Sequence, residues 1–492
     1  MVHKPLNILF VSPEAAPFAK TGGLADVAGA LPCALAKLGH RVKLVIPRYG
    51  VIDGAAHGFK EWLRLEVPSP SGAIPAVIER GVFSEEKVPV LAVRHDPFFA
   101  RASLYGEGGR DYPDNLERFT FFCRAVMELL PRLAQDGWTP DLLHAHDWQS
   151  ALCTVYPRTL YKPVPEANQL GTVFTIHNIG YQGHFPEADY PKTGLGMDLF
   201  TPAGLEFYKK LNLMKGGLLF ADRLTTVSPT YSREIQTPEF GFGLEGVVRG
   251  RADRLVGIVN GIDTDVWDPE TDHYLASRYG LAKITGKSVC KMALQQEMHL
   301  PVRNVPLLVV VSRLSDQKGL DLVADIVPAL MTEELQLVLL GSGDPDLEAR
   351  FRSLHEQWPQ KFGLRIGFDD GLAHRIQAGG DLFLMPSRYE PCGLSQLYSL
   401  RYGTVPIVRQ TGGLADTVAA YGASEMATGF AFKEASAGAL LSTIRAALAV
   451  YAHPKRWAAL MQAGMKTDVS WAKSARAYAD LYEQVTSIHP RA

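Results

Sequence analysis

The sequence has few cysteines, no long apolar run and almost no net charge, and each of these features excludes a class of protein. Its five cysteines are scattered among 492 residues without Cys-x-x-Cys spacing, which argues against a disulfide framework and against structural zinc. No stretch has the uninterrupted apolar length of a membrane span. A formal net charge of −2 gives no bulk attraction to nucleic acid or to an anionic membrane, so we expect neither as a partner.

The first residues show no targeting pattern. Met1–Pro5 leads directly into the strand-like run 6–11, so we expect no signal or transit peptide. Together with the scattered thiols, this start predicts a reducing, cytoplasmic location. A composition of 47% hydrophobic and 21% charged residues is typical of a globular chain, and the length predicts two domains instead of one core.

Alternating apolar runs and helical patterns predict an α/β protein with parallel sheets. The chain opens with a strand at 6–11, a helix at 24–38 and a strand at 41–46. Buried-strand patterns then follow in two series, at 141–145, 171–176, 223–227 and 255–259, and at 307–311, 336–340, 364–367, 382–385 and 405–408. Helical patterns separate most of these strands, as parallel pairing requires.

The two series of strands predict two nucleotide-fold domains. A turn-rich segment at 260–269 suits a hinge between them. We place an N-terminal Rossmann-like domain at residues 1–250 and a C-terminal one at 251–471. The last part of the chain, from about 436 to 486, has a helical pattern.

Two stretches of the chain nearly repeat. Lys20–Val27 and Gln410–Val418 share Thr-Gly-Gly-Leu-Ala-Asp, and each follows an apolar strand and opens an amphipathic helix. This placement predicts one Gly-rich loop in each nucleotide-fold half. The alternative is a shared strand-to-helix turn that needs two small residues, which explains the glycines but not the recurring Leu, Ala and Asp.

Positive side chains and glycines gather after strands of both halves. Arg313 and Lys318 follow the strand at 307–311, and their side chains together suit a diphosphate. Alone, such a pair is also typical of solvated surface. The loop at 388–397 opens a helix whose free N–H groups suit phosphate oxygens, and Lys20 with Gly23 offers the same device in the first half. Glu390, in that loop, is either a helix-capping acid or a site residue.

Histidines and acids at strand ends of the first half suggest recognition of sugar hydroxyls. His144, His146 and Asp147 end one strand, and His177 with Asn178 ends the next. Imidazole, amide and carboxylate groups beside aromatic side chains are typical of a polyol site. The spacing His144-x-His146 lacks a third ligand, so we predict no metal site and no cofactor.

With these motifs in place, the chain resembles the bacterial glycogen synthases, which are closely related to the plant starch synthases. The resemblance covers nearly the whole chain, and the order and spacing of its motifs are more specific than any one of them. The motifs lie at 20–26, 146–148, 175–178, 259–263, 312–314, 317–319, 386–394 and 411–416.

The resemblance implies the GT-B fold, in which two Rossmann-like domains face each other across a deep cleft. It implies that a C-terminal helix, at 472–492, packs back on the first domain. The implied activity is transfer of glucose from ADP-glucose to the non-reducing end of an α-1,4-glucan with retention of configuration and release of ADP. The implied partners are ADP-glucose and a glycogen or malto-oligosaccharide acceptor.

The resemblance also implies roles for individual residues. The catalytic set would be Glu390, His177, Lys318, Arg313 and Asp147. The donor would be bound by Lys20, Gly23, Asn260, Arg313, Lys318, Cys392, Gly393, Leu394 and Ser395. The acceptor groove would be lined by Tyr105, Tyr112 and Asn115.

The chain departs from the wider pattern of retaining enzymes at two positions. These enzymes pair two glutamates separated by seven residues, and the second position after Glu390 is Tyr398. The same absence in bacterial glycogen synthases favours ADP-glucose as the donor. Gln149 stands where histidine is common, which puts only a secondary contact in doubt.

Other functions stay open at this point. A non-catalytic α-glucan-binding protein would have the same fold, and so would a transferase that prefers UDP-glucose. A dehydrogenase is disfavoured because the first loop is not Gly-x-Gly-x-x-Gly, and a glucan phosphorylase needs a pyridoxal-binding lysine in a much longer chain. Oligomeric state, allosteric control and acceptor length leave no pattern in the sequence.

Overall fold

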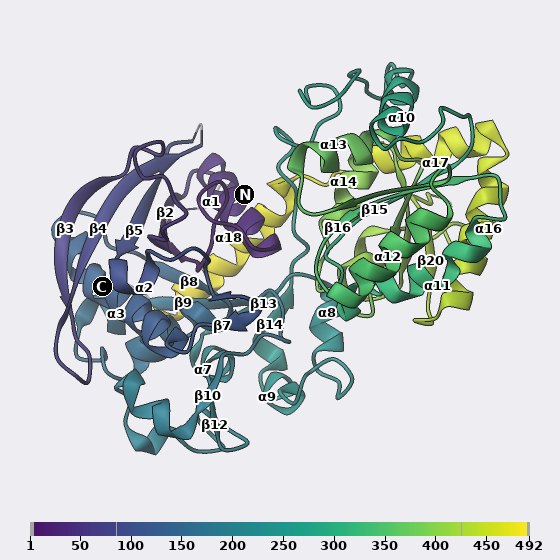
Figure 1. Ribbon diagram of the computed structural model, residues 1–492. Helices are drawn as coiled ribbons and strands as arrows, with labels where there is room; N and C mark the ends of the chain where they lie inside the picture. Colours follow the sequence, from purple (N-terminus) through teal and green to yellow (C-terminus); the bar gives the residue numbers. More distant parts are fainter. Residues whose placement is uncertain (1–3, 85, 425, 490–492) are drawn as a thin grey trace. The chain divides into compact units, whose positions relative to one another are not determined.

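The computed structural model, which describes residues 4–84, 86–424 and 426–489, divides the chain into two units (Figure 1). Unit 1 comprises the residues up to Val227, Ser232–Asn260 and the residues from Trp471 onward. Unit 2 comprises Ser228–Tyr231 and Gly261–Ser470. The chain therefore leaves unit 1 for unit 2 and returns to unit 1 for its last helix.

Within the described residues, unit 1 is built on a nine-stranded sheet. The order of its strands is β14 (Leu255–Gly257), β13 (Arg223–Thr226), β9 (Gly171–Ile176), β8 (Leu142–His146), β1 (Asn7–Val11), β2 (Arg41–Pro47), β5 (Val88–Arg94), β4 (Ile74–Phe83) and β3 (Lys60–Val67). Pairing is parallel from β14 to β5 and antiparallel from β5 to β3. Strands β1 and β9 are buried along their whole length because helices cover both faces of the sheet.

The helices of unit 1 follow its strands. They are α1 (Gly23–Lys37), α2 (Asp96–Phe99), α3 (Asn115–Gln135), α4 (Asp147–Ser150), α5 (Leu152–Val155), α6 (Pro165–Asn168), α7 (Leu213–Phe220), α9 (Glu245–Arg249) and α18 (Trp471–Ile488). The C-terminal helix α18, yellow in Figure 1, packs against α1 and β9. Small β pairs lie in the connections, at β6 (Gly106–Glu107) with β7 (Arg110–Asp111), and among β10 (His184–Pro186), β11 (Glu206–Phe207) and β12 (Lys210–Asn212).

Unit 2 is a parallel sheet, six-stranded within the described residues. Its order is β17 (Phe362–Ile366), β16 (Gln336–Gly341), β15 (Leu307–Val311), β18 (Leu382–Met385), β19 (Val405–Arg409) and β20 (Phe430–Phe432). Its helices are α10 (Gly286–Glu297), α11 (Leu320–Leu330), α12 (Pro345–Gln357), α13 (Asp370–Gly379), α14 (Ser395–Arg401), α15 (Gly412–Thr417), α16 (Ala437–Tyr451) and α17 (Pro454–Lys466). A further short helix, α8 (Pro229–Glu234), begins in the segment that clusters with this unit.

Alternate residues of the unit 2 strands enter separate cores on the two faces of the sheet. Leu308 and Val310 pack with α11, α12 and α16, whereas Val309 packs with α10 and α13. This alternation explains why the strands are apolar throughout, since both of their faces are covered. The α/β prediction of two Rossmann-like domains is confirmed. No helix in the described part of the chain has the length and apolar character needed to cross a membrane.

Candidate active site

The strand order of unit 2 predicts where a ligand binds. From β15 the strands run to β16 and β17 on one side and to β18, β19 and β20 on the other. In open parallel sheets, ligands bind at the carboxyl ends of the strands where the order reverses, which here is between β15 and β18. The loop after β15 carries Arg313 and Lys318, and the loop after β18 carries Glu390. These predicted residues therefore lie at the reversal point.

Lys318 and Glu390 form an ion pair. The Lys318 Nζ lies 2.6 Å from Glu390 Oε2, and the Ser387 hydroxyl donates to the same oxygen at 2.9 Å. The lysine and glutamate side chains are 16% and 6% exposed. Arg313, by contrast, is exposed. A buried carboxylate thus holds a lysine at the edge of the sheet, beside an arginine that faces solvent.

The second copy of the repeat packs directly on the Glu390 loop. A Cβ on Gly412, where φ is +44°, would lie 1.9 Å from the Glu390 carbonyl oxygen, and one on Gly413 would lie 2.2 Å from the Cys392 carbonyl oxygen. The Gly413 N–H donates to the Glu390 carbonyl at 3.1 Å. In the first copy, a Cβ on Gly22 would meet no atom within 4 Å. Gly412 and Gly413 are therefore needed for close packing, whereas Gly22 is not.

The predicted donor loop Cys392–Ser395 leads into helix α14. Cys392 is buried, and Gly393 has a φ of +72°, which a glycine adopts without strain. The Gln396 amide donates to the Cys392 carbonyl at 3.0 Å and to the Thr417 hydroxyl at 3.1 Å, so it fixes the loop to the second repeat. No side chain caps the first turn of α14, whose N–H groups suit an anion.

Tyr398 fills the place of the second glutamate of the wider family. Its ring stacks on Trp267, with centroids 3.7 Å apart and an interplanar angle of 10°. Trp267 stacks in the same way on His374. Tyr398 is buried, so this position belongs to the core under α14.

The strand order of unit 1 places a similar reversal beside β1. This strand lies between β2 and β8, so the loops after β1 and β8 meet at one edge of the sheet. The first loop carries Glu14 and Lys20, and the second begins with Asp147. Lys20 donates to Asp26 at 2.6 Å, and Gly23 is the first residue of α1.

Glu14 is a buried acid that the sequence analysis missed. Its carboxylate accepts from the Thr21 N–H at 2.5 Å and from the Thr21 hydroxyl at 3.0 Å, so it holds the first repeat in place. Burial raises the pKa of Glu14 from 4.5 to about 7. The sequence did show that Glu14 follows the first strand, and ligands of a parallel sheet bind at the carboxyl ends of its strands.

Asp147 has a strained backbone and a buried carboxylate. Its φ is +54°, a conformation that is uncommon for residues other than glycine and that recurs at functional sites. Its Oδ1 accepts from the His177 N–H at 2.7 Å. Burial raises the pKa of Asp147 to about 7, and the nearby charge of Glu14 adds to this rise. The structure therefore brings Glu14, Asp147 and His177 together in unit 1.

His177, predicted to be catalytic, and Asn260, predicted to bind the donor, are also buried in unit 1. The His177 Nε2 lies 2.9 Å from His146 Nδ1, and burial lowers the pKa of His177 to about 3. The Asn260 Oδ1 is buried and has no hydrogen-bond partner among the described residues. A buried amide oxygen without a partner is costly, which makes this group a candidate for ligand contact.

The predicted acceptor loop is held by a buried arginine. Arg118 donates to Asn115 Oδ1 at 2.6 Å and to the Leu104 carbonyl at 2.9 Å, and its guanidinium lies over the Tyr112 ring. The Asn115 amide donates in turn to the Tyr105 carbonyl at 2.9 Å. Asn115 is therefore used inside the loop, while the Tyr105 hydroxyl lies beside Glu14. Arg118 gave no clear signal in the sequence because an arginine that follows Asp114 and Glu117 is also typical of a solvated helix face.

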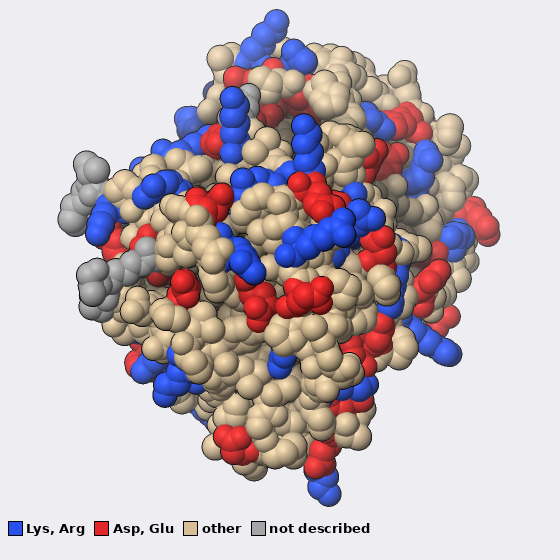
Figure 2. All heavy atoms as spheres, turned by 90° about the vertical axis from the view of Figure 1, so that its left-hand side faces the viewer, with Lys and Arg blue, Asp and Glu red and all other residues tan. Residues whose placement is uncertain are grey.

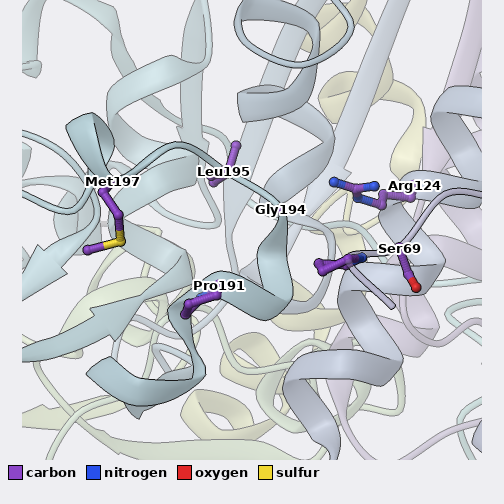
Figure 3. A pocket seen from close by; sticks show the side chains of 7 residues that line it. Ser69, Arg124, Pro191, Gly194, Leu195 and Met197 are labelled. Carbon is purple, nitrogen blue, oxygen red and sulfur yellow. The ribbon is translucent and has the colours of Figure 1, made fainter. Parts of the chain in front are cut away.

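A separate cavity in unit 1, of about 400 Å³, contains none of the predicted site residues (Figure 3). Arg124 from α3 lines it and donates to the carbonyls of Pro68 and Thr193, at 2.8 and 3.2 Å. This arginine thereby ties together two connections of unit 1. The other lining residues are Ser69, Pro70, Pro191, Gly194, Leu195 and Met197.

The charges on the face in Figure 2 are mixed. Among the residues described there, Lys and Arg alternate with Asp and Glu and neither sign forms a separate patch. Within the described part of the chain, no three or more His, Cys, Asp and Glu side chains are grouped to hold a metal ion.

A Glu14→Gln variant should be more stable than the wild type at high pH. The unfolded chain releases the Glu14 proton near pH 4.5 and the folded chain near 7, so the wild type loses stability as the pH rises through this window. The rise in pKa corresponds to about 3 kcal/mol. Urea unfolding should show this gain for the variant at pH 8 and none at pH 4. Exposed Glu66 provides a control, since Glu66→Gln should change the free energy of unfolding by no more than about 0.5 kcal/mol at pH 8.

Comparison with known proteins places both units in characterised families. Residues 7–250 match the starch synthase catalytic domain family, and residues 294–460 match the glycosyl transferases group 1 family. The chain is 48% identical to a glycogen synthase of Anaeromyxobacter sp. (strain Fw109-5), over 98% of this chain and 100% of the relative. It is 47% identical to a glycogen synthase of Desulforudis audaxviator, over 98% of this chain and 97% of the relative.

A comparison with solved structures also finds a starch synthase. The catalytic domain of starch synthase IV from Arabidopsis thaliana, bound to ADP and acarbose, superposes with a TM-score of 0.91 at 33% identity. The superposition covers 98% of this chain and 100% of that one. A sucrose-phosphate synthase from Thermosynechococcus elongatus, at 17% identity and a TM-score of 0.59, shares the fold.

Proposed function

Because the chain belongs to the glycogen and starch synthase family of glycosyltransferases, which have the GT-B fold, we propose that it extends an α-1,4-glucan with glucose from ADP-glucose. The glucose joins the non-reducing end with retention of configuration, and ADP is released. The observation that carries the proposal is the pairing of Lys318 with Glu390 at the reversal point of the unit 2 sheet. Such a site holds an anionic leaving group next to a carboxylate.

The donor's diphosphate is bound by unit 2 in this proposal. Arg313 offers two parallel N–H donors and Lys318 a compact charge, and the uncapped first turn of α14 adds backbone N–H groups. These groups stabilise the negative charge that develops on the leaving ADP. The loop that leads into that turn is formed by Cys392, Gly393, Leu394 and Ser395.

The sugar and the acceptor are bound by the buried polar groups of unit 1 in this proposal. Asp147, His177 and Asn260 contact the transferring glucose, together with Glu390. Tyr105 and Tyr112 line the acceptor path, and Asn115 holds the loop that presents them. Sugar hydroxyls need such a mixture of acceptors and donors beside aromatic rings.

The proposed chemistry needs no nucleophile from the protein. The bond between C1 of the glucose and the diphosphate oxygen breaks, and an oxocarbenium-like glucosyl group forms. The acceptor's 4-hydroxyl attacks C1 from the same face, and its proton passes to the departing phosphate oxygen. The alternative is a covalent intermediate on Asp147 or Glu390, but Asp147 Oδ1 accepts from the His177 N–H and Glu390 Oε2 is paired with Lys318.

The proposal is tested by incubating the protein with ADP-glucose and glycogen and measuring both products. We expect one ADP released for each glucose added, and a lower kcat/KM with UDP-glucose. Binding of glycogen without release of ADP would instead favour a non-catalytic glucan-binding protein. Equal or better turnover of UDP-glucose would contradict the choice of donor.

We further propose that Phe368 stacks on the nucleobase. It follows β17, is 86% exposed, and lies two strands from β15, or about 10 Å along the sheet edge. Stacking of a base on an aromatic ring is worth about 1–3 kcal/mol, so Phe368→Ala should raise the KM for ADP-glucose about tenfold with kcat nearly unchanged. Tyr208→Ala removes an aromatic ring of unit 1 that is 79% exposed, and it should leave this KM unchanged. An unchanged KM in Phe368→Ala would refute the stacking role.

A further inference from the structure

Three buried histidines lie next to one another at the predicted sugar site of unit 1. His144 and His146 are on β8, and His177 follows β9. The rings of His144 and His146 are 4.0 Å apart, and His146 Nδ1 lies 2.9 Å from His177 Nε2. Burial lowers the pKa of all three, so each imidazole is neutral and carries a single proton. In the bond between His146 and His177, one ring must donate and the other must accept.

The surroundings of His146 decide which ring donates. Its other nitrogen, Nε2, is buried and has no hydrogen-bond partner among the described residues. A buried N–H without an acceptor is rarer in folded proteins than a buried acceptor without a donor, so the bare nitrogen is the favoured choice at this position. The single proton of His146 therefore belongs on Nδ1, where it is donated to His177 Nε2. His177 must then carry its own proton on Nδ1.

We propose that His146 is a positioning residue that fixes His177 as the Nδ1–H tautomer, so that His177 presents an N–H donor to an oxygen of the substrate. Within the described part of the chain the His177 side chain is bonded through Nε2 and not through Nδ1, and the residue keeps 9% of its surface exposed, which leaves Nδ1 for a ligand. The identity of that oxygen, a glucosyl hydroxyl or a phosphate oxygen, rests on the proposed function. The assignment of the His177 proton to Nδ1 does not rest on the proposed function.

Neighbouring groups hold the donating ring in place. The His146 ring lies 4.1 Å from the Phe10 ring and 4.0 Å from the His144 ring, measured between centroids. His144 is itself fixed by Tyr482 of α18 at 2.7 Å and by the Thr175 hydroxyl at 2.5 Å. The C-terminal helix therefore supports the imidazole that orients His177.

Substitutions at position 146 separate donation from packing. In His146→Asn the side-chain NH₂ occupies the place of Nδ1–H, so this variant should keep kcat within about threefold of wild type. His146→Leu has no donor and should lose about 10²-fold in kcat, the cost of removing one preorganised donor, with a smaller change in the donor KM. If both variants are folded and equally impaired, or if His146→Leu is fully active, the positioning role is wrong.

A spectroscopic measurement tests the tautomer without any activity. Long-range ¹H–¹⁵N spectra of the ¹⁵N-histidine-labelled full chain distinguish protonated from bare ring nitrogens, and His177→Asn identifies the signals of His177. We expect the His177 proton on Nδ1 in the wild type and in His146→Asn. A proton on Nε2 in the wild type would overturn the proposal even if the chain is a fully active glucosyltransferase.

Discussion

A Lys318→Met variant is expected to lose about 10³-fold in kcat/KM for ADP-glucose, because a preorganised cation that faces the leaving diphosphate contributes to the transition state more than to the ground state. Its Nζ lies 2.6 Å from Glu390, so the variant also leaves a buried carboxylate without its partner. Breaking a buried pair in this way costs about 3–5 kcal/mol. Steady-state kinetics and thermal unfolding should therefore both change.

The loss of activity can be separated from the loss of stability with a second substitution. Lys318→Met combined with Glu390→Gln removes both charges and should regain most of the stability, while activity stays low. Lys455→Met provides the matched control, because Lys455 is exposed on α17 of the same unit and should tolerate the change. If Lys318→Met alone loses stability but keeps its kcat/KM for ADP-glucose, Lys318 is a structural residue only.

An Asp147→Asn variant is expected to lose about 10²-fold in kcat while remaining at least as stable as the wild type. Asparagine tolerates the left-handed backbone at φ +54° and keeps an oxygen for the His177 N–H, so only the carboxylate charge is removed. In the proposed mechanism that charge stabilises the oxocarbenium-like glucosyl group. Since burial raises the pKa of Asp147 to about 7, wild-type kcat should rise with pH through 7 as the carboxylate ionises.

The companion variant Asp147→Ala distinguishes charge from backbone strain. Alanine is strained in the left-handed conformation at φ +54° and offers no acceptor to the His177 N–H. The Asp147→Ala variant should therefore unfold at a lower temperature than Asp147→Asn. Its kcat should nevertheless fall to a similar level. A pH–rate profile that is unchanged in Asp147→Asn would show that another group produces the ionisation near 7.

The strand-end charges could be predicted from the sequence because each follows an apolar run. Arg313, Lys318 and Glu390 come directly after unit 2 strands, and a parallel sheet collects such residues at one edge. The pairing of Lys318 with Glu390 could not be predicted, since it depends on which strands are neighbours. Glu14 was missed because a single acid carries no motif, although its place after β1 marks the same edge.

Local pattern also predicted most of the parallel strands of both units to within a few residues, but it missed β20 of unit 2. It missed the antiparallel extension β3 to β5, whose outer strand is largely exposed and mixes charged with apolar side chains. The region predicted as helical from 436 to 486 is divided into α16, α17 and α18. Pro454 begins α17, in the first-turn position that proline favours.

The repeated Thr-Gly-Gly-Leu-Ala-Asp segments show why a shared sequence does not establish a shared role. Gly412 and Gly413 are needed because the Glu390 loop approaches their Cα atoms closely. In the first copy Thr21 is the residue that fixes the loop, through Glu14. The same six letters thus serve close packing in unit 2 and anchoring to a buried acid in unit 1, and only the structure separates the two.

The most direct test of the account is to follow glucose labelled with ¹³C at C1 from ADP-glucose into maltoheptaose by NMR. We predict one new α-1,4-linked anomeric signal for each ADP formed, with no β-linked product and no lasting release of free glucose. Label that appears only as free glucose, or in a β linkage, would contradict retaining transfer to a glucan.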